Sequence, residues 1–184
     1  VIDVSGSTFS DFSGTTTVGD RNDDGDPDEI ADAIIEGFDV LNQHISAIDF
    51  GVAVNAALIP FSSTAGIASV QQPGQDVDGN GQSDLIDLLE TADQSAPLGA
   101  VNVGGGTDFP DGLQEAVDFF NAQPVGDNFV FFLSDGQNNG GSFDAQVAEL
   151  LGPSIDAQIA AFGVGGGAAM DEIDFVDDGL DNDS

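Results

Sequence analysis

Three oxygen-bearing side chains stand close together at the start of the chain: Asp3, Ser5 and Ser7. The apolar residues around Asp3, within residues 1–4, predict a short buried strand. Gly6 lets the backbone turn tightly where this strand ends. The spacing can therefore aim one carboxylate and two hydroxyls at a single point, and these are the hard oxygen ligands that Mg²⁺ and Ca²⁺ prefer. Because three oxygens do not complete such a site, we expect other parts of the chain to supply more.

Two later segments offer further oxygen ligands. Thr107 follows three consecutive glycines in the stretch VNVGGGTDF, and glycines let a backbone pack close to an ion or a neighbouring loop. Asp135 follows the apolar run FVFFL at residues 129–133, which predicts a central strand covered on both faces by helices. Each feature has an ordinary alternative, because a glycine triplet is usually a turn and polar residues often cap strand ends.

Together the three segments resemble the metal-ion-dependent adhesion site (MIDAS) of von Willebrand factor A (vWA) domains. DVSGS is similar to the DxSxS motif of that family, GGT to its threonine loop and SDG to the end of a later strand. The three stand in family order, and the resemblance covers nearly the whole chain. It implies Mg²⁺, or alternatively Ca²⁺ or Mn²⁺, and one coordination position open to a carboxylate of a partner. The implied ligands are Asp3, Ser5, Ser7, Thr107 and Asp135.

The Asp-rich segment DRNDDGDPDE at residues 20–29, called loop 1 below, predicts a calcium site. Alternate residues carry oxygen atoms and Gly25 occupies the sixth place, as in an EF-hand loop. The twelfth place is Ala31, so either Asp32 substitutes for the missing acid or the ion is bound as in thrombospondin type 3 repeats. The alternative is a solvated acidic loop before a helix. The candidate ligands are Asp20, Asn22, Asp24, Asp26 and Asp28.

A second Asp-rich segment, residues 76–87, is called loop 2 and matches the EF-hand spacing more closely. Gly81 occupies the sixth place, and the twelfth place is an aspartate, shorter than the usual bidentate glutamate. The vWA family does not normally carry such an insertion. The alternative is an acidic turn that caps a following helix at residues 85–91. The candidate ligands are Asp76, Asp78, Asn80, Gln82 (through its carbonyl), Asp84 and Asp87.

The composition is strongly acidic. The 184 residues include 34 acids, of which 28 are Asp and six are Glu, against the single base Arg21, for a formal net charge of -33. An excess of Asp favours turns and metal ligation. Such a chain repels itself at low ionic strength and is a poor partner for nucleic acid or anionic membranes. There is no cysteine, which excludes disulfides and thiolate metal sites, and no apolar run reaches the length of a membrane span.

Hydrophobic spacing predicts alternating helices and strands. Helices are expected at residues 30–48, 85–91, 111–122, 143–151 and from 170 onward, and strands at 1–4, 50–61, 129–133 and 155–164. Pro60 is expected to end the second strand, and the single His44 to lie on the surface near a helix end. This order predicts one α/β domain, with a doubly wound and mostly parallel sheet flanked by helices, of vWA or Rossmann-like type. Ligands of such sheets bind outside the carboxyl ends of the strands.

These observations favour an adhesion or ligand-binding module of a secreted or cell-surface protein, similar to vWA domains of large bacterial calcium-dependent (RTX-type) adhesins. Weak calcium loops suit the millimolar calcium found outside cells. The expected partner is a protein or glycan with an acidic group, without nucleic-acid binding or membrane insertion, and no oligomeric state is indicated. The alternatives are a structural calcium-binding spacer and a vWA domain that assembles an enzyme complex. We expect no enzymatic activity, because no nucleophile–base pair is evident. The tail VDDGLDNDS resembles the opening of a further calcium loop and suggests a fragment of a longer protein.

Overall fold

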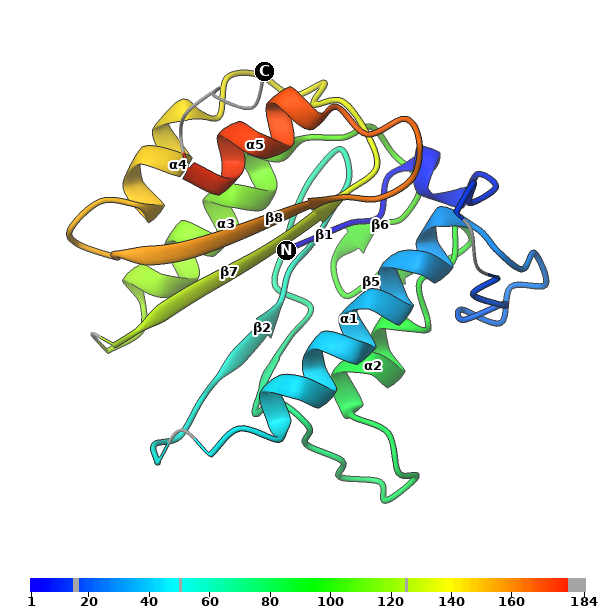
Figure 1. The fold of residues 1–184 in the computed structure, drawn as a ribbon, viewed down its shortest axis with the longest axis horizontal. Coiled ribbons are helices and arrows are strands. Elements are labelled where there is room, and N and C mark those ends of the chain that lie inside the picture. Colours follow the sequence, from blue (N-terminus) through cyan, green and yellow to red (C-terminus); the bar gives the residue numbers. More distant parts are fainter. Residues whose placement is uncertain (15–16, 50, 125, 179–184) are drawn as a thin grey trace.

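A parallel sheet of four strands forms the centre of the described part of the molecule (Figure 1). The computed structural model describes residues 1–14, 17–49, 51–124 and 126–178. The strands lie in the order β3–β1–β7–β8, and their bounds are Pro60–Phe61 (β3), Ile2–Asp3 (β1), Asn128–Ser134 (β7) and Ala157–Gly163 (β8). All three pairings are parallel. The continuous apolar run of β7 suits its place inside the sheet, where both faces are covered.

Helices cover both faces of this sheet (Figure 1). One face carries α1 (Ile30–Ser46) and α2 (Asp84–Leu89), and the other carries α3 (Phe109–Asn121), α4 (Asp144–Leu150) and α5 (Met170–Asp178). Successive residues of β7 point to opposite faces of the sheet. Phe132 packs in the cluster of α3, α4 and α5, whereas Leu133 packs with α1 and α2. The predicted α/β class with a parallel, helix-flanked sheet is therefore confirmed.

Shorter elements complete the described part of the chain. A 3₁₀ helix, η1 (Gly6–Phe9), follows β1 directly. Two small antiparallel pairs join β2 (Ala56–Leu58) to β4 (Ser69–Gln71) and β5 (Pro97–Leu98) to β6 (Val101–Asn102). No helix of the described residues combines the length and the apolar character that crossing a membrane requires.

The single strand predicted at residues 50–61 is wrong. Within its described part, residues 51–55 form no strand, and two short strands, β2 and β3, follow; Phe50 lies outside the described residues. Pro60 belongs to β3 and does not end the strand. The N–H groups of Ile2 and Val4 donate to the carbonyls of Ile59 (2.9 Å) and Phe61 (2.8 Å), so the ladder on this side needs no N–H from Pro60.

The predicted helices are confirmed with shifted ends. Helix α3 begins two residues early because Asp108 caps it, accepting a hydrogen bond from the Asp111 N–H at 3.1 Å, and Pro110 occupies its first turn. Helix α5 extends to Asp178, so the first residues of the predicted calcium-like tail are helical. The rest of that tail, residues 179–184, lies outside the described residues.

The strand order places a topological switch beside β1. The chain runs from β1 through α1 to β3 on one side, and later returns through α3 to β7 on the other side. The carboxyl ends of β1 and β7 are therefore neighbours, with Ile2 in register with Leu133. Open α/β sheets bind ligands at such a crevice.

Candidate metal centre

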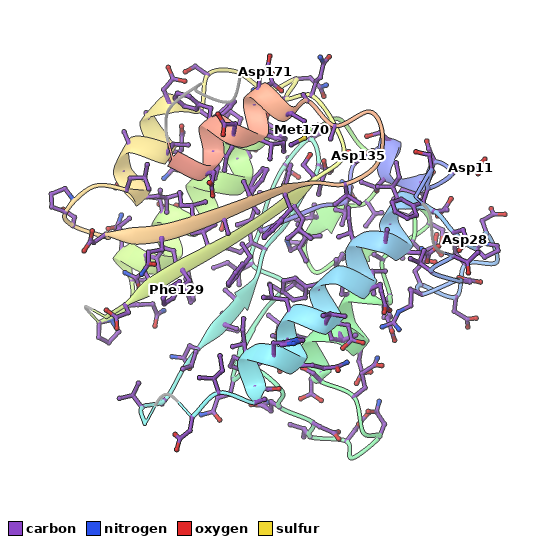
Figure 2. The ribbon with its side chains drawn as sticks, viewed as in Figure 1. Asp11, Asp28, Phe129, Asp135, Met170 and Asp171 are labelled. Carbon is purple, nitrogen blue, oxygen red and sulfur yellow. The ribbon has the colours of Figure 1, made fainter. Side chains whose placement is uncertain are left out.

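Two buried carboxylates meet at the switch point. Asp3 is the last residue of β1, and Asp135 follows β7 directly. The two residues are 1% and 5% exposed. Figure 2 shows Asp135 at the opposite end of β7 from Phe129, which is the carboxyl end of the sheet. The positions of the strand ends thus bring together two acids that are far apart in the sequence.

The serines of the first segment connect these acids. The backbone N–H of Ser5 donates to Asp3 Oδ1 at 2.8 Å, because the chain turns sharply after β1. The Ser5 and Ser7 hydroxyls lie 3.2 Å apart, and Ser7 Oγ donates to Asp135 Oδ1 at 3.0 Å. Ser5 is 1% exposed, whereas Ser7 lies on the surface. The cluster therefore extends from the buried acids to the solvent.

Thr107 joins the same cluster from the glycine loop. A Cβ placed on Gly136 would lie 3.5 Å from both Ser7 Oγ and Thr107 Oγ1, so the three segments are in close contact. The backbone of the glycine loop packs directly on the first segment, with the Gly6 N–H bonded to the Gly105 carbonyl at 2.9 Å. Gly104 has φ +83, a conformation that favours glycine.

The acids of this cluster are held in an unfavourable electrostatic setting. Burial raises the pKa of Asp3 from 3.8 to about 6, and the Asp135 charge adds to the rise, although hydrogen bonds from Ser134 and Ser5 oppose it. Burial likewise raises the pKa of Asp135, and hydrogen bonds from Ser7 and the Asp3 carboxyl oppose that rise. Two buried carboxylates with neutral hydroxyls beside them form a site that a cation would stabilise.

Some neighbours of this cluster were not predicted from the sequence. Ser134 Oγ donates to Asp3 Oδ2 at 2.5 Å, so a residue of β7 orients the acid of β1. Asn139 binds both backbone groups of Thr107: its side-chain oxygen accepts from the Thr107 N–H at 2.6 Å, and its own N–H donates to the Thr107 carbonyl at 2.7 Å. Asn138 donates its N–H to Glu172 Oε2 of α5 at 2.7 Å. The only sequence signal was the polar run QNN after SDG.

The donor set suits a hard divalent cation. It contains carboxylate and hydroxyl oxygens alone, from Asp3, Ser5, Ser7, Thr107 and Asp135, and Mg²⁺, Ca²⁺ and Mn²⁺ prefer such ligands. No positive side chain competes for the acids, because Arg21, the one basic residue of the chain, is engaged elsewhere. The structure therefore brings the five residues predicted from the sequence close to one another, and the metal ion that they would hold stays a prediction.

Loop 2 gathers three of its six predicted ligands. Oxygen atoms of Asp76, Asp78 and Asp84 all lie within 4.8 Å of one another, and among the described residues no other group of three acids reaches this spacing. The loop is exposed, and its own backbone orients it: Asp76 accepts from the N–H groups of Gly79 (2.7 Å) and Gly81 (2.9 Å). The Gly81 bond is the main reason that the pKa of Asp76 is lowered.

The other three predicted ligands of loop 2 bind one another. The side-chain amides of Asn80 and Gln82 donate to the Asp87 carboxylate at 3.0 and 2.8 Å. Gln82 also donates to Glu90 Oε2 at 2.6 Å. Asp87 is thus occupied by amide donors in this structure, and the carboxylate trio stands apart from it.

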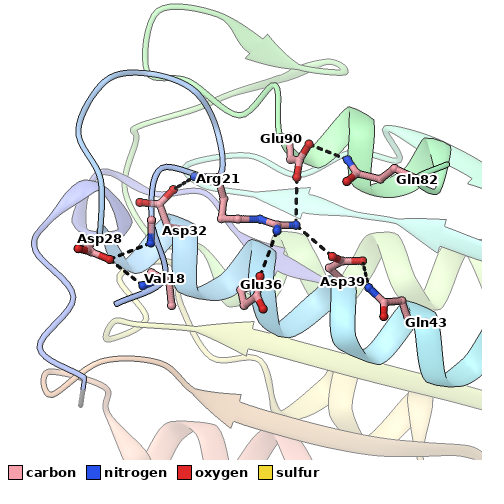
Figure 3. Close-up of polar contacts among 10 residues, drawn as sticks. Val18, Arg21, Asp28, Asp32, Glu36, Asp39, Gln43, Gln82 and Glu90 are labelled. Atoms are coloured by element: carbon pink, nitrogen blue, oxygen red, sulfur yellow. Dashed lines mark hydrogen bonds and ion pairs between the residues drawn. The ribbon is translucent and has the colours of Figure 1, made fainter. Parts of the chain in front are cut away.

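Loop 1 shares the internal bonding of loop 2 but differs at its end. In both loops the sixth-place glycine donates to the first aspartate, at 3.1 Å from Gly25 to Asp20 in loop 1. Asp28, however, accepts from the N–H groups of Val18 (2.7 Å) and Gly19 (2.8 Å), outside the loop (Figure 3). The five predicted ligands of loop 1 are not brought together as a cluster of carboxylates at the spacing seen in loop 2.

Asp32 does not replace the missing twelfth ligand of loop 1. Its carboxylate accepts from the N–H groups of Arg21 at 2.6 Å and Glu29 at 2.9 Å, so it closes the loop and caps α1. Its side chain is completely buried. The acid that sequence spacing offered as a metal ligand is therefore used by the backbone.

Arg21 ties loop 1 to both helices of this face. Its guanidinium lies 3.1 Å from Glu36 and 3.1 Å from Asp39, both on α1, and 3.0 Å from Glu90, which follows α2 (Figure 3). Because Glu90 also accepts from Gln82, a chain of contacts runs from loop 1 to loop 2. The one positive side chain of the protein thus serves its framework and not the metal centre.

Comparison with known proteins supports the fold. No family model and no curated protein matches the chain. One solved structure similar to this chain is proximal thread matrix protein 1 from the mussel byssus, with 18% sequence identity. The match covers 96% of this chain and 37% of that chain and has a TM-score of 0.54. A point mutant of the PilB minor pilin from Streptococcus sanguinis is 18% identical, with 73% and 28% covered and a TM-score of 0.49.

A third solved structure is an aerotolerance-related membrane protein from Bacteroides fragilis. It is 15% identical, with 89% of this chain and 64% of that chain covered and a TM-score of 0.49. The chain therefore spans between about a quarter and two thirds of the length of these three proteins. At such identities the similarity concerns the fold alone. The support for the fold comes from the mussel protein, which has the highest TM-score of the three.

Proposed function

We propose that the protein is a metal-ion-dependent adhesion or ligand-binding module whose cation lies at the carboxyl ends of β1 and β7. The observation that carries this proposal is the meeting of Asp3 and Asp135, both buried and both with a raised pKa, beside the hydroxyl groups of Ser5 and Ser7. The resemblance of these segments to a MIDAS agrees with the geometry, and it supplies Mg²⁺ as the first candidate, with Ca²⁺ and Mn²⁺ as alternatives.

The residues of the centre have separate tasks in this proposal. Asp3 and Asp135 supply negative charge from beneath the surface, and Ser5, Ser7 and Thr107 supply neutral oxygens. Ser134 and Asn139 orient Asp3 and Thr107. When bound, the cation offers a positively charged position to an acidic group of a partner.

The net charge decides the range of this recognition. A chain of formal charge -33 repels an acidic partner at long range, and physiological salt screens that repulsion over about 8 Å. The partner, a protein or glycan carrying an acidic group, is therefore bound by short-range contact with the ion and not by electrostatic steering. Nucleic acid and membrane insertion have no place in this proposal.

Loop 2 supports a second, structural use of metal ions. The Asp76, Asp78 and Asp84 trio suits Ca²⁺, and such weak exposed sites fill at the millimolar calcium outside cells. We therefore place the protein outside the cell or on its surface, as in bacterial calcium-dependent adhesins. A structural calcium spacer is the second candidate function, since the trio alone would serve it. A role in assembling an enzyme complex is the third, and we propose no catalytic activity.

The test is calorimetric titration of chelator-treated protein with Mg²⁺ and then Ca²⁺. Asp3→Asn and Asp135→Asn should each lose one Mg²⁺ site and keep the Ca²⁺ sites, because they remove charge only from the centre. Asp118→Asn, an exposed acid on α3, is the matched control and should bind as wild type does. Wild-type stoichiometry in both centre variants would contradict the metal centre.

Recognition of an acidic group needs its own measurement. Immobilised protein is exposed to a library of short peptides that carry one Glu, and to the same peptides with Gln in its place. Retention of some Glu peptides only, and only with Mg²⁺, is the expected result, since the Gln peptides lack the charge for the ion. Equal retention of both sets would leave the structural spacer as the better account.

A further inference from the structure

Two buried oxygen atoms in loop 1 have no hydrogen-bond partner among the residues that the structure describes: Asn22 Oδ1 and Glu29 Oε2. The two residues are only 6% and 8% exposed. Buried polar atoms are normally paired, and leaving one unpaired is costly, above all for a carboxylate. Both atoms therefore have unused capacity to bind a ligand.

The orientation of the Asn22 side chain is determined by its surroundings. Its Nδ2 donates to the Ala92 carbonyl at 2.9 Å and to Asp24 Oδ2 at 3.0 Å. Both partners are acceptors, so the amide cannot be turned around without placing its oxygen against them. The amide nitrogen is thus committed to the framework, and Oδ1 is left as a free acceptor.

Glu29 faces other acids. The pKa of Glu29 is raised to about 7, mainly by burial and then by the charges of Asp24, Asp32, Asp26 and Asp11, with Asp24 the strongest of the four. Asp24 also accepts from Asn22 Nδ2, so it contacts one of the two side chains and its charge acts on the other. The nearby guanidinium of Arg21 binds acids on α1 and at the end of α2 instead.

We propose that loop 1 binds Ca²⁺ through Asn22 Oδ1 and Glu29 Oε2, with the Asp24 carboxylate as the third protein ligand. This ligand set departs from the EF-hand pattern, because Asp28 and Asp32 are engaged by backbone N–H groups and Glu29 takes the place of the missing acid. Ca²⁺ suits such an irregular set better than Mg²⁺, which demands near-ideal octahedral geometry. Among the described residues, loop 1 holds no group of three acids as close as the trio of loop 2, and this proposed set relies on two carboxylates and one amide oxygen.

Such an ion would support the segment that follows Ser7. Asp11 forms a β-bridge with Glu29, the Phe12 N–H donates to the Asp28 carbonyl at 2.7 Å, and the Ile30 N–H donates to the Ser10 carbonyl at 2.9 Å. The calcium site is independent of the cation at Asp3, and either one can fail without the other.

The decisive variant is Glu29→Gln, which removes the charge and keeps the shape. Equilibrium dialysis with Ca²⁺ should show one ion fewer per chain than wild type, and the Mg²⁺ bound at the Asp3 centre should not change. In chelator at pH 8 its melting temperature should rise by roughly 3–6 °C, because a buried charge with one unpaired oxygen is gone. Glu115→Gln on α3 removes one carboxylate outside the loops and should match wild type in both measurements.

Two results would overturn the proposal. One is an unchanged number and affinity of bound Ca²⁺ ions in Glu29→Gln. The other is a lower melting temperature in chelator, which would mean that the carboxylate stabilises the metal-free fold. If Glu29→Gln does not fold, Asp24→Asn replaces it: this exposed residue would lose the charge of the third ligand, which should narrow the gap in melting temperature between calcium and chelator. An equal or wider gap would also overturn the proposal.

Discussion

Two groups of aspartates in this molecule face opposite electrostatic conditions. At the metal centre, Asp3 and Asp135 are buried, and burial is the main cause that raises the pKa of each. In loop 2, the carboxylate trio lies at the surface, and N–H groups of the loop, that of Gly81 above all, lower the pKa of Asp76. Ionised aspartates are therefore destabilised by burial at the metal centre and well solvated in loop 2.

The difference concerns what each group does without a metal ion. The buried pair loses hydration and gains only hydroxyl and amide donors, so its ionised form destabilises the metal-free fold. The exposed trio keeps its water and its backbone donors, so it is tolerated empty. A cation should thus be integral to the centre, and an optional reinforcement in loop 2.

The largest expected effect is the pH dependence of the metal-free protein. The pKa of Asp3 rises from 3.8 to about 6 on folding, so the folded state binds the proton more tightly than the unfolded state. Its contribution to stability is present in full below about pH 4 and is lost as the pH rises through about 6, a change of about 3 kcal/mol. Urea denaturation in chelator between pH 4 and 7 measures it.

Variants show whether this pH dependence comes from the buried aspartates of the metal centre or from the exposed aspartates of loop 2. Asp3→Asn should flatten that part of the curve, because it removes the titrating group. Asp76→Asn should leave the slope in place, since Asp76 is fully exposed to solvent and its pKa is lowered. The contrast between the buried and the exposed group would collapse if Asp3→Asn kept the wild-type slope.

The next effect concerns the framework beneath both loops. Arg21→Gln should lower the free energy of unfolding by about 2 kcal/mol, because Glu36, Asp39 and Glu90 would then repel one another without a cation. Chemical denaturation measures the change. Arg21→Lys is the matched control and should recover only part of it, since one ammonium cannot span three carboxylates as a guanidinium does. Full recovery by lysine would show that charge alone matters.

A smaller effect is expected when the trio of loop 2 is removed. The double variant Asp76→Asn/Asp78→Asn should have nearly the same free energy of unfolding as wild type in chelator, because these residues are exposed. With calcium at ten times its dissociation constant it should lack a gain of about 1.4 kcal/mol that wild type shows. Thermal denaturation with and without calcium gives both values. A large loss in chelator would mean that the trio supports the fold even when empty.

The smallest effect concerns the contact between the two loops. Gln82→Ala removes the amide that joins Asp87 to Glu90 and should cost about 0.5–1 kcal/mol. Gln114→Ala, which loses an exposed bond to Asp118 and a long 3.4 Å bond from Gln146, is the matched control and should cost less. Denaturation in urea compares the two. A smaller loss of unfolding free energy for Gln82→Ala than for the control would mean that the contact between loop 2 and the framework around Arg21 does not stabilise the fold.

Much of the fold was predictable because its signals are local. The period of three to four residues in α1 and the apolar run of β7 identify their elements without reference to partners. The strand at residues 50–61 failed because its apolar character is shared between two short strands with different partners, β4 and β1. Such a division depends on pairing, which sequence period does not record.

The sequence by itself determined which oxygen-bearing residues are available and in what order, through the glycines and strand ends beside Asp3, Thr107 and Asp135. Only the tertiary structure decided how they are used. Among the described residues, Asn22 Oδ1 has no partner because the amide nitrogen of the same side chain binds the Ala92 carbonyl, 70 residues away. Asp32 is not available as a ligand because backbone N–H groups donate to its carboxylate. Burial and hydrogen-bond partners depend on residues distant in the chain. Sequence spacing can therefore identify candidate ligands, but only packing determines which of them are available.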